Sequence, residues 1–184
     1  MRPEVVRRRD PALLLALLAS LLMAAPLHAQ ALDAIAVQAT FVPKFPRYVA
    51  WPAARQPARG APYQLCVIGE DPFGPRLDAA AASERIDDHG VMVRRLPDGS
   101  GADACHLAFV QGRQPVETSR MLFALRDRPV LTITAGAAAE RGMIHLATIA
   151  GRVRFFINDA EAARHGLTIS SRLLALAAGV TPRR

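Results

Sequence analysis

Three arginines in the last third of the sequence are the residues best placed to do chemistry. Arg152 and Arg154 flank a valine in a run of alternating hydrophobicity, so both side chains are predicted to project from one face of a strand. Arg172 opens the last helical segment, where either of two preceding serines can cap the helix. Guanidinium groups bind carboxylates and phosphates in bidentate geometry, and a helix N-terminus adds N–H donors. The pattern predicts a small-anion or partner-contact site made by Arg152, Arg154, Arg172, Ser170, Ser171 and Asn158.

The same residues also have an explanation that needs no ligand. Arginines on a solvated sheet face keep their charged ends in water and require no partner. Asn158 stands where a strand ends, and its side chain can satisfy backbone groups at that point. From the sequence alone, both explanations stay open.

No recognised catalytic arrangement is present in the sequence. Cys105 and His106 do not form a thiol nucleophile and its base, because adjacent strand residues point to opposite faces. The serine pair at 170–171 lacks the G-x-S-x-G elbow of a hydrolase, and no glycine-rich phosphate loop occurs. The histidines beyond residue 31, none with a partner pattern, are His89, His106, His145 and His165. The sequence therefore predicts a protein that is not an enzyme and uses no cofactor or metal.

Two cysteines, Cys66 and Cys105, each lie in an apolar, strand-like run. An even number of cysteines in an exported protein favours a disulfide. The bridge would close a loop of about 40 residues and stabilise the fold by roughly 3 to 4 kcal/mol. Two buried thiols that never meet are the alternative.

The N-terminus has the pattern of a secretory signal peptide. Basic residues precede an uncharged apolar run at 12–25, and Ala29-Gln30-Ala31 offers a cleavage site. The apolar run is shorter than the about 20 residues of a membrane span. Removing residues 1–31 deletes four arginines and two acids, so the formal charge falls from +7 to +5. Residues 32–184 are predicted to form a single periplasmic domain.

Strands that alternate with helices predict an α/β fold. The sheet is expected to be mixed, with about six strands and helices on both faces, and to close with a β-hairpin and a helix. The predicted strands are 63–69, 91–96, 104–110 and 130–134, and the hairpin has its alternation at 144–148 and 153–157. Helices are expected at 75–83 and 159–163. A helix at 115–126 is expected to turn Val116, Met121, Leu122 and Leu125 inward. The last helix is expected to begin at Ser170 or Ser171 and to have Leu173, Leu174, Ala177 and Ala178 on one face.

The first segment after the signal, residues 33–49, has an apolar stripe at helical spacing. Pro43 and Pro46 each remove a backbone donor, so the helix is expected to be kinked or interrupted. Four aromatic side chains cluster here, which suits core packing by default and a partner or dimer interface as the alternative. They are Phe41, Phe45, Tyr48 and Trp51.

Several segments in register resemble the YfiR family of periplasmic proteins. They are FVPKFPRYVAWP (41–52), LCVIGEDPFG (65–74), CHLAFV (105–110), GMI (142–144), GRVRFFIN (151–158), the glycine of HGL (166) and ISSRLLALA (169–177). The resemblance implies a repressor that binds the periplasmic sensor region of a membrane diguanylate cyclase and lowers cyclic di-GMP signalling, favouring motility over biofilm. It also implies capture by an outer-membrane lipoprotein and homodimer formation. Family members often carry a second cysteine pair further downstream, which this sequence lacks.

Three functional hypotheses follow. The first is the periplasmic repressor that the resemblance implies. The second is a ligand-sensing or solute-binding module for a small anion, which rests on the arginine cluster. The third, a secreted hydrolase of unrecognised type, has no motif behind it. Nucleic acid is excluded as a partner, because an exported chain seldom meets it and no aromatic-basic platform is apparent.

Overall fold

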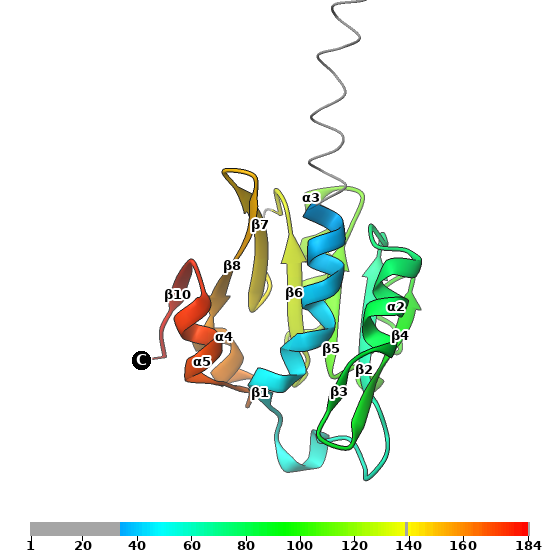
Figure 1. The fold of residues 1–184 in the computed structure, drawn as a ribbon. Helices are drawn as coiled ribbons and strands as arrows, with labels where there is room; N and C mark the ends of the chain where they lie inside the picture. Colours follow the sequence, from blue (N-terminus) through cyan, green and yellow to red (C-terminus); the bar gives the residue numbers. More distant parts are fainter. Residues whose placement is uncertain (1–33, 139, 184) are drawn as a thin grey trace, which may run out of the picture. The chain divides into compact units, whose positions relative to one another are not determined.

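A mixed sheet of eight strands, in the order β10-β8-β7-β6-β5-β2-β4-β3, organises the part of the chain that the computed structural model describes, residues 34–138 and 140–183 (Figure 1). Its strands are β2 (Tyr63–Gly69), β3 (Arg85–Ile86), β4 (His89–Leu96), β5 (Leu107–Gln111), β6 (Leu131–Ala135), β7 (Ile144–Ile149), β8 (Arg152–Asn158) and β10 (Gly179–Thr181). A separate antiparallel pair joins β1 (Val49–Ala50) to β9 (Thr168–Ile169). The sequence predicted the mixed α/β class, but the expected strand number of about six was too low.

Helices cover both faces of the sheet, as predicted. Residues 34–41 are helical, and the other helices are α2 (Pro75–Ala82), α3 (Pro115–Ala124), α4 (Asp159–Arg164) and α5 (Ser171–Leu176). Short 3-10 turns are η1 (Val42–Tyr48), η2 (Ala53–Arg55) and η3 (Ala102–Ala104). We call the face that carries residues 34–48, α2 and α5 the front face, which is turned to the viewer in Figure 1, and the face that carries α3 the back face.

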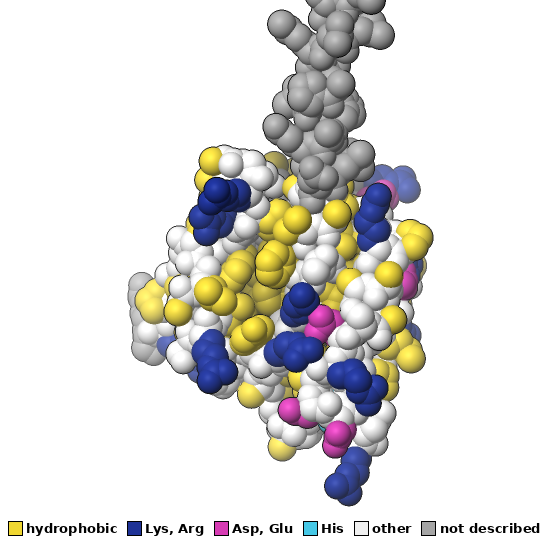
Figure 2. All heavy atoms as spheres, in the orientation of Figure 1, with side chains coloured by type: hydrophobic (Ala, Val, Ile, Leu, Met, Phe, Trp, Pro, Cys, Tyr) yellow, Lys and Arg dark blue, Asp and Glu magenta, His cyan; other side chains and the backbone are white. Residues whose placement is uncertain are grey.

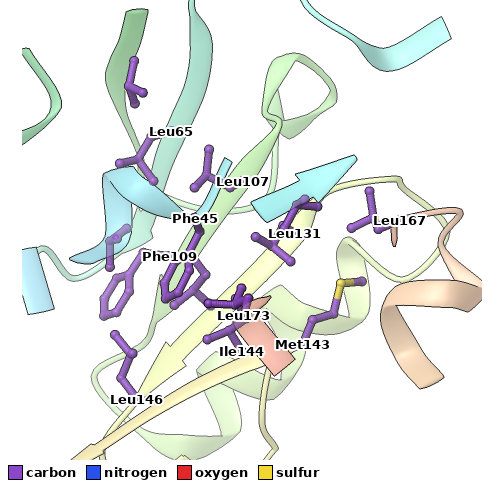
Figure 3. Packing of buried hydrophobic residues seen from close by; sticks show 14 of the residues in the cluster. Phe45, Leu65, Leu107, Phe109, Leu131, Met143, Ile144, Leu146, Leu167 and Leu173 are labelled. Carbon is purple, nitrogen blue, oxygen red and sulfur yellow. The ribbon is translucent and has the colours of Figure 1, made fainter. Parts of the chain in front are cut away.

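The central strands β2, β5 and β6 are mostly apolar, as expected for strands with both faces buried. In β2, Leu65 and Val67 join the front core, whereas Cys66 and Ile68 join the back core under α3. The same alternation divides β5 between the two cores. Figure 3 shows the front core, where Phe45 from η1 lies among leucines from β2, β5 and β6.

The neighbouring strands β4, β2, β5, β6 and β7 run parallel. Strand β8 then pairs with β7 as an antiparallel hairpin. β2 pairs in parallel with both β4 and β5, and β5, β6 and β7 continue in parallel order. β7 and β8 pair antiparallel around Ala150 and Gly151, which both have positive φ, as a type I′ turn requires. The predicted hairpin and its turn are confirmed.

The two prolines interrupt the first helix where the sequence predicted. The α-helix ends at Phe41, and a 3-10 helix with Pro43 in its first turn and Pro46 inside it follows. Each proline lacks the N–H that an α-helical bond needs, so the chain tightens into the 3-10 form. The change still leaves Val42 and Phe45 buried in the front core.

Two details of the predicted helices are wrong. In α3, Val116 is exposed rather than inward, because the buried stripe follows Thr118, Leu122 and Leu125 at spacings of four and three. The last helix ends at Leu176, and the chain turns extended at Ala177 instead of continuing the predicted apolar face. The extension lets β10 pair in parallel with β8 through Gly179 and Phe156. The chain approaches closely here, since a Cβ on Gly179 would lie 3.0 Å from the Phe156 ring.

Cys66 and Cys105 form the predicted disulfide. Cys66 lies on β2 and Cys105 just before β5, and their Cα atoms are 5.8 Å apart. Both residues are fully buried in the back core beneath α3. The bridge therefore ties together two neighbouring central strands on the face opposite α2 and α5.

An ion pair stabilises the position of the C-terminal strand, and loss of this ion pair is expected to destabilise the protein. The Arg183 guanidinium donates from Nε and Nη2 to the two carboxylate oxygens of Asp159, at 2.7 and 2.9 Å. Asp159 is buried, so Arg183→Ala would leave its carboxylate without this partner. We expect the free energy of unfolding to fall by about 1 to 2 kcal/mol, less than for a fully buried pair because Arg183 is partly exposed.

Urea unfolding of Arg183→Ala measures this effect, and Arg172→Ala is the matched control because Arg172 is exposed on α5. The control should stay within about 0.5 kcal/mol of the unsubstituted protein. Equal losses in both variants would show that the ion pair does not fasten the strand.

His106 is expected to make stability depend on pH. The Gln64 N–H donates to His106 Nδ1 at 2.9 Å, so that nitrogen must be unprotonated. Burial, with the charge of Arg55 nearby, lowers the pKa of His106 from its ordinary 6.5 to about 4. As the pH falls, the unfolded chain binds a proton at this histidine near pH 6.5, whereas the folded protein binds it only near pH 4. The free energy of unfolding therefore has its full value above about pH 6.5 and falls by about 2 to 3 kcal/mol as the pH decreases toward 4.

Unfolding midpoints measured across this pH window test the expectation. Burial and the charge of Arg141 also lower the pKa of His145, so the difference between the unsubstituted protein and His106→Gln isolates His106. The substitution should make the unfolding midpoint depend less on pH in the acidic part of this window. Parallel curves for the two proteins would contradict the assignment.

Candidate functional site

The three predicted arginines do not come together. Cross-strand pairing places Arg154 opposite Ala147 and Arg152 opposite Ile149. Phe155, which follows Arg154 in β8, packs on Phe45 of the front core with ring centroids 6.1 Å apart. Neighbouring strand residues point to opposite faces, so Arg152 and Arg154 project from the back face. Arg172 lies on α5, which covers the front face.

The polar residues of the predicted site have structural partners instead. Asn158 Oδ1 accepts the Glu161 N–H at 3.0 Å, and Ser170 Oγ accepts the Leu173 N–H at 3.4 Å. Both are therefore N-caps, of α4 and α5 respectively. Ser171 is the exposed first residue of α5. The six residues do not line one anion site.

Two of the four predicted interface aromatics belong to the core. Phe45 and Trp51 are buried, and the Trp51 indole N–H donates to the His106 carbonyl at 3.0 Å. Phe41 is 44% exposed, and Tyr48 is half-buried against the front core. Phe41 and Tyr48 are thus the aromatic residues of this region that reach the surface.

Ligands of doubly wound sheets usually bind where the strand order reverses, at the carboxyl ends of the strands. Here that point lies between β2 and β5, and polar groups at this point are already hydrogen-bonded or ion-paired within the protein. Arg113 Nε reaches Glu70 Oε1 across the crevice at 3.0 Å. The N–H groups of Gly112 and Arg113 donate to Thr118 and Glu117, at 2.9 and 2.8 Å. These donors are already used, so the crevice is not a ready phosphate cradle.

A hollow of about 840 Å³ lies between the end of α3 and α4, and several of its charged residues pair within the protein. Glu161 contacts both Arg164 and His165. Arg128 lies 3.2 Å from Asp103, and its carbonyl contacts His165 Nδ1 at 2.9 Å. Among the described residues, no cluster of three or more His, Cys, Asp or Glu side chains is arranged to hold a metal ion.

The most distinctive surface is an apolar area on the front face. Figure 2 shows hydrophobic side chains gathered in the hollow between the first helical segment and the elements formed by β7, β8 and α5. Val37 and Phe41 are exposed on the first helix, and Leu176 of α5 is 65% exposed. Tyr48, Phe155 and Leu174 are partly buried and pack against the front core. We call this surface the apolar face: Val37, Phe41, Tyr48, Phe155, Leu174 and Leu176.

The structure shows why the sequence reasoning found only part of this surface. In the first helical segment the side chains that face the core include Ala39 and Val42, whereas Val37, within the predicted apolar stripe of residues 33–49, is exposed. Leu176 stands off the buried side of α5, which Leu173 occupies. A leucine or valine outside the core stripe of a short helix is the signal that marks such a surface.

Two further expectations bear on where the protein acts. In the described part of the chain, none of the helices combines the length and hydrophobicity that a membrane span requires. The signal peptide predicted for residues 1–31 lies outside the described residues.

Comparison with known proteins gives one family match. A family model described as YfiR/HmsC-like matches residues 35–178. A solved structure of a conserved domain protein from Vibrio cholerae O1 biovar El Tor, strain N16961, is 13% identical with a TM-score of 0.46. The alignment covers 64% of this chain and 54% of that chain, so the present protein spans about half the length of that neighbour. No curated protein matches the sequence.

Proposed function

The chain belongs to the YfiR/HmsC-like family, and from that premise we propose that it is a periplasmic regulatory protein, not an enzyme, that represses an inner-membrane diguanylate cyclase. It does so by binding the periplasmic sensor region of the cyclase, and so lowers cyclic di-GMP signalling. The family supports the class of function, a regulator. The partner and the direction of regulation are proposals.

The apolar face is the single observation that carries this proposal. Side chains such as Phe41 and Leu176 stay exposed to water although the same elements bury their other sides in the front core. Contiguous exposed apolar surface marks interaction sites, and aromatic anchors near the centre of an interface often carry most of its binding energy. Charged side chains lie beside this surface, where Arg47 and Lys44 pair with Glu84.

Repression through binding requires a preference between two states of the cyclase. A partner that binds active and inactive conformers equally shifts nothing, however tightly it binds. We propose that the apolar face is complementary to the sensor region in its inactive arrangement. Release then raises cyclase activity, and an outer-membrane lipoprotein that covers the same face would produce that release by competition.

Export to the periplasm rests on the sequence of residues 1–31 and on the disulfide. A buried disulfide between Cys66 and Cys105 persists in an oxidising compartment. Because the chain lacks a second cysteine pair, redox control through such a pair does not operate here. A separate anion-sensing function is not proposed, since Arg172 lies on the face opposite to Arg152 and Arg154.

Cellular cyclic di-GMP tests the proposal directly. Deleting the gene should raise the cyclic di-GMP level, and the increase should disappear when the membrane cyclase is also inactivated. Pull-down from solubilised membranes with the tagged protein should recover that cyclase. Unchanged cyclic di-GMP on deletion, together with no cyclase recovered, would refute the function, and recovery of only a second copy of the chain would show self-association instead of cyclase binding.

A further inference from the structure

The back face of the β7–β8 hairpin carries three arginines. Residues 141–158 contain these arginines and no aspartate or glutamate; among the residues that the structure describes, Glu140, next to Arg141, forms no ion pair with it, and Asp159 pairs with Arg183. Arg152 and Arg154 project from the back face of β8, next to Phe156 of the same strand face. The Arg141 guanidinium lies 5.6 Å from the centre of the Phe156 ring, which brings it to this surface. We call Arg141, Arg152, Arg154, Ile149 and Phe156 the basic strip.

These arginines differ from those that stabilise the fold. Arg47, Arg95 and Arg183 each reach a carboxylate within 3 Å. Within the part of the chain that the structure describes, the arginines of the basic strip have no carboxylate at ion-pair distance. Their charges are therefore available to an external anion.

Toward the tip of the hairpin, the sheet face that carries Arg152 and Arg154 is exposed, whereas His145 nearer the sheet centre is buried. The back core that α3 covers is built from β2, β5 and the segment leading into β6, and includes Cys66, Ala108 and Val130. Further along the sheet, Arg152 and Arg154 are exposed, and Ile149 is 48% exposed beside the Ala150-Gly151 turn. The hairpin thus presents an apolar side chain near its tip with arginines along the adjoining strand.

We propose that the basic strip docks the protein on anionic phospholipid headgroups of the membrane. Guanidinium groups bind phosphate in bidentate geometry, and arginines two residues apart on a strand lie about 7 Å apart, a spacing that laterally mobile headgroups can match. An apolar tip flanked by cations is also the composition of interfacial segments, which bury a few side chains at the headgroup boundary.

The basic strip and the apolar face lie on opposite faces of the sheet, so both can be occupied together. Each arginine near an anionic surface raises the affinity about five-fold, and three give about a 100-fold gain in affinity. The inference does not depend on the proposed repressor function, because vesicles that contain no protein suffice to test it.

Co-sedimentation with vesicles provides the test. The protein, purified in the form that the cell produces, is mixed with phosphatidylcholine vesicles with or without phosphatidylglycerol, at low and high salt. We expect binding to phosphatidylglycerol vesicles at low salt that is about 100-fold tighter than binding to phosphatidylcholine alone and that weakens with salt. The triple variant Arg141→Ala, Arg152→Ala, Arg154→Ala should lose most of this difference.

A matched triple variant separates the strip from general charge. Arg76→Ala, Arg120→Ala, Arg172→Ala removes the same charge from exposed positions elsewhere and should keep binding within a few-fold of the unsubstituted protein. Ile149→Ser should weaken binding to vesicles, whereas inorganic phosphate at matched ionic strength should not compete. Equal loss in the two triple variants, competition by phosphate, or unchanged vesicle binding by the Arg141→Ala, Arg152→Ala, Arg154→Ala variant would each overturn the proposal.

Discussion

Replacing both Cys66 and Cys105 by alanine is expected to lower the free energy of unfolding by roughly 3 to 4 kcal/mol. The two residues are 39 positions apart, so the bridge restricts a long loop of the unfolded chain. The native state contributes as well, because both side chains are fully buried under α3 and alanine leaves part of their volume empty. A loss of this size is a large share of the stability of a domain of this length.

Urea unfolding of the double alanine variant, with the unsubstituted protein before and after reduction, measures the effect. Reduction of the native protein should be slow, since neither sulfur is accessible to solvent. The apolar face lies on the other side of the sheet, so the folded fraction of the variant should still bind its partner. A loss below about 1 kcal/mol, or abolished binding by a fully folded variant, would contradict this account of the disulfide.

Substituting Phe41 and Leu176 together by aspartate is expected to release the cyclase from repression. Both side chains are exposed, at 44% and 65%, so the fold should tolerate the change. Two buried carboxylates in an apolar interface would each cost several kcal/mol, which corresponds to at least about a 100-fold loss of affinity. Cyclic di-GMP in cells that carry the variant should reach the level of the deletion strain.

Phe123→Asp is the matched control for this experiment. Phe123 is 61% exposed on α3, on the opposite face of the sheet, and its ring contacts the Arg126 guanidinium at 4.0 Å. The control should repress normally, and the double variant should keep a normal urea midpoint and periplasmic level. Repression by the double variant equal to that of the control would show that the partner binds elsewhere.

The sequence predicted the elements that have a strong periodic signal. The hairpin alternation, the apolar run of β5 and the proline-interrupted first helix each follow from local chemistry that the tertiary structure does not override. β3 and β10 were missed because strands of two and three residues have too few positions for a period. The end of α5 was missed because Gly179 is drawn into pairing with Phe156, a residue distant in sequence.

The candidate site was harder to predict because it depends on which face each element presents. Arg152 and Arg154 were correctly assigned to one strand face, but the sequence does not tell which side of the sheet α5 and its Arg172 occupy. Burial of Phe45 and exposure of Phe41 likewise depend on the 3-10 segment that begins at Val42. Side chains in one short segment can therefore have opposite roles.

The central claim is that this protein binds a membrane diguanylate cyclase through the apolar face and holds it inactive. Its most direct test is to add the purified protein to membranes, opened to expose their periplasmic side, and to measure their diguanylate cyclase activity. The account predicts a saturable fall in activity with the unsubstituted protein and with Phe123→Asp, and no fall with the Phe41→Asp, Leu176→Asp variant. Cyclase activity unchanged by saturating unsubstituted protein would contradict it.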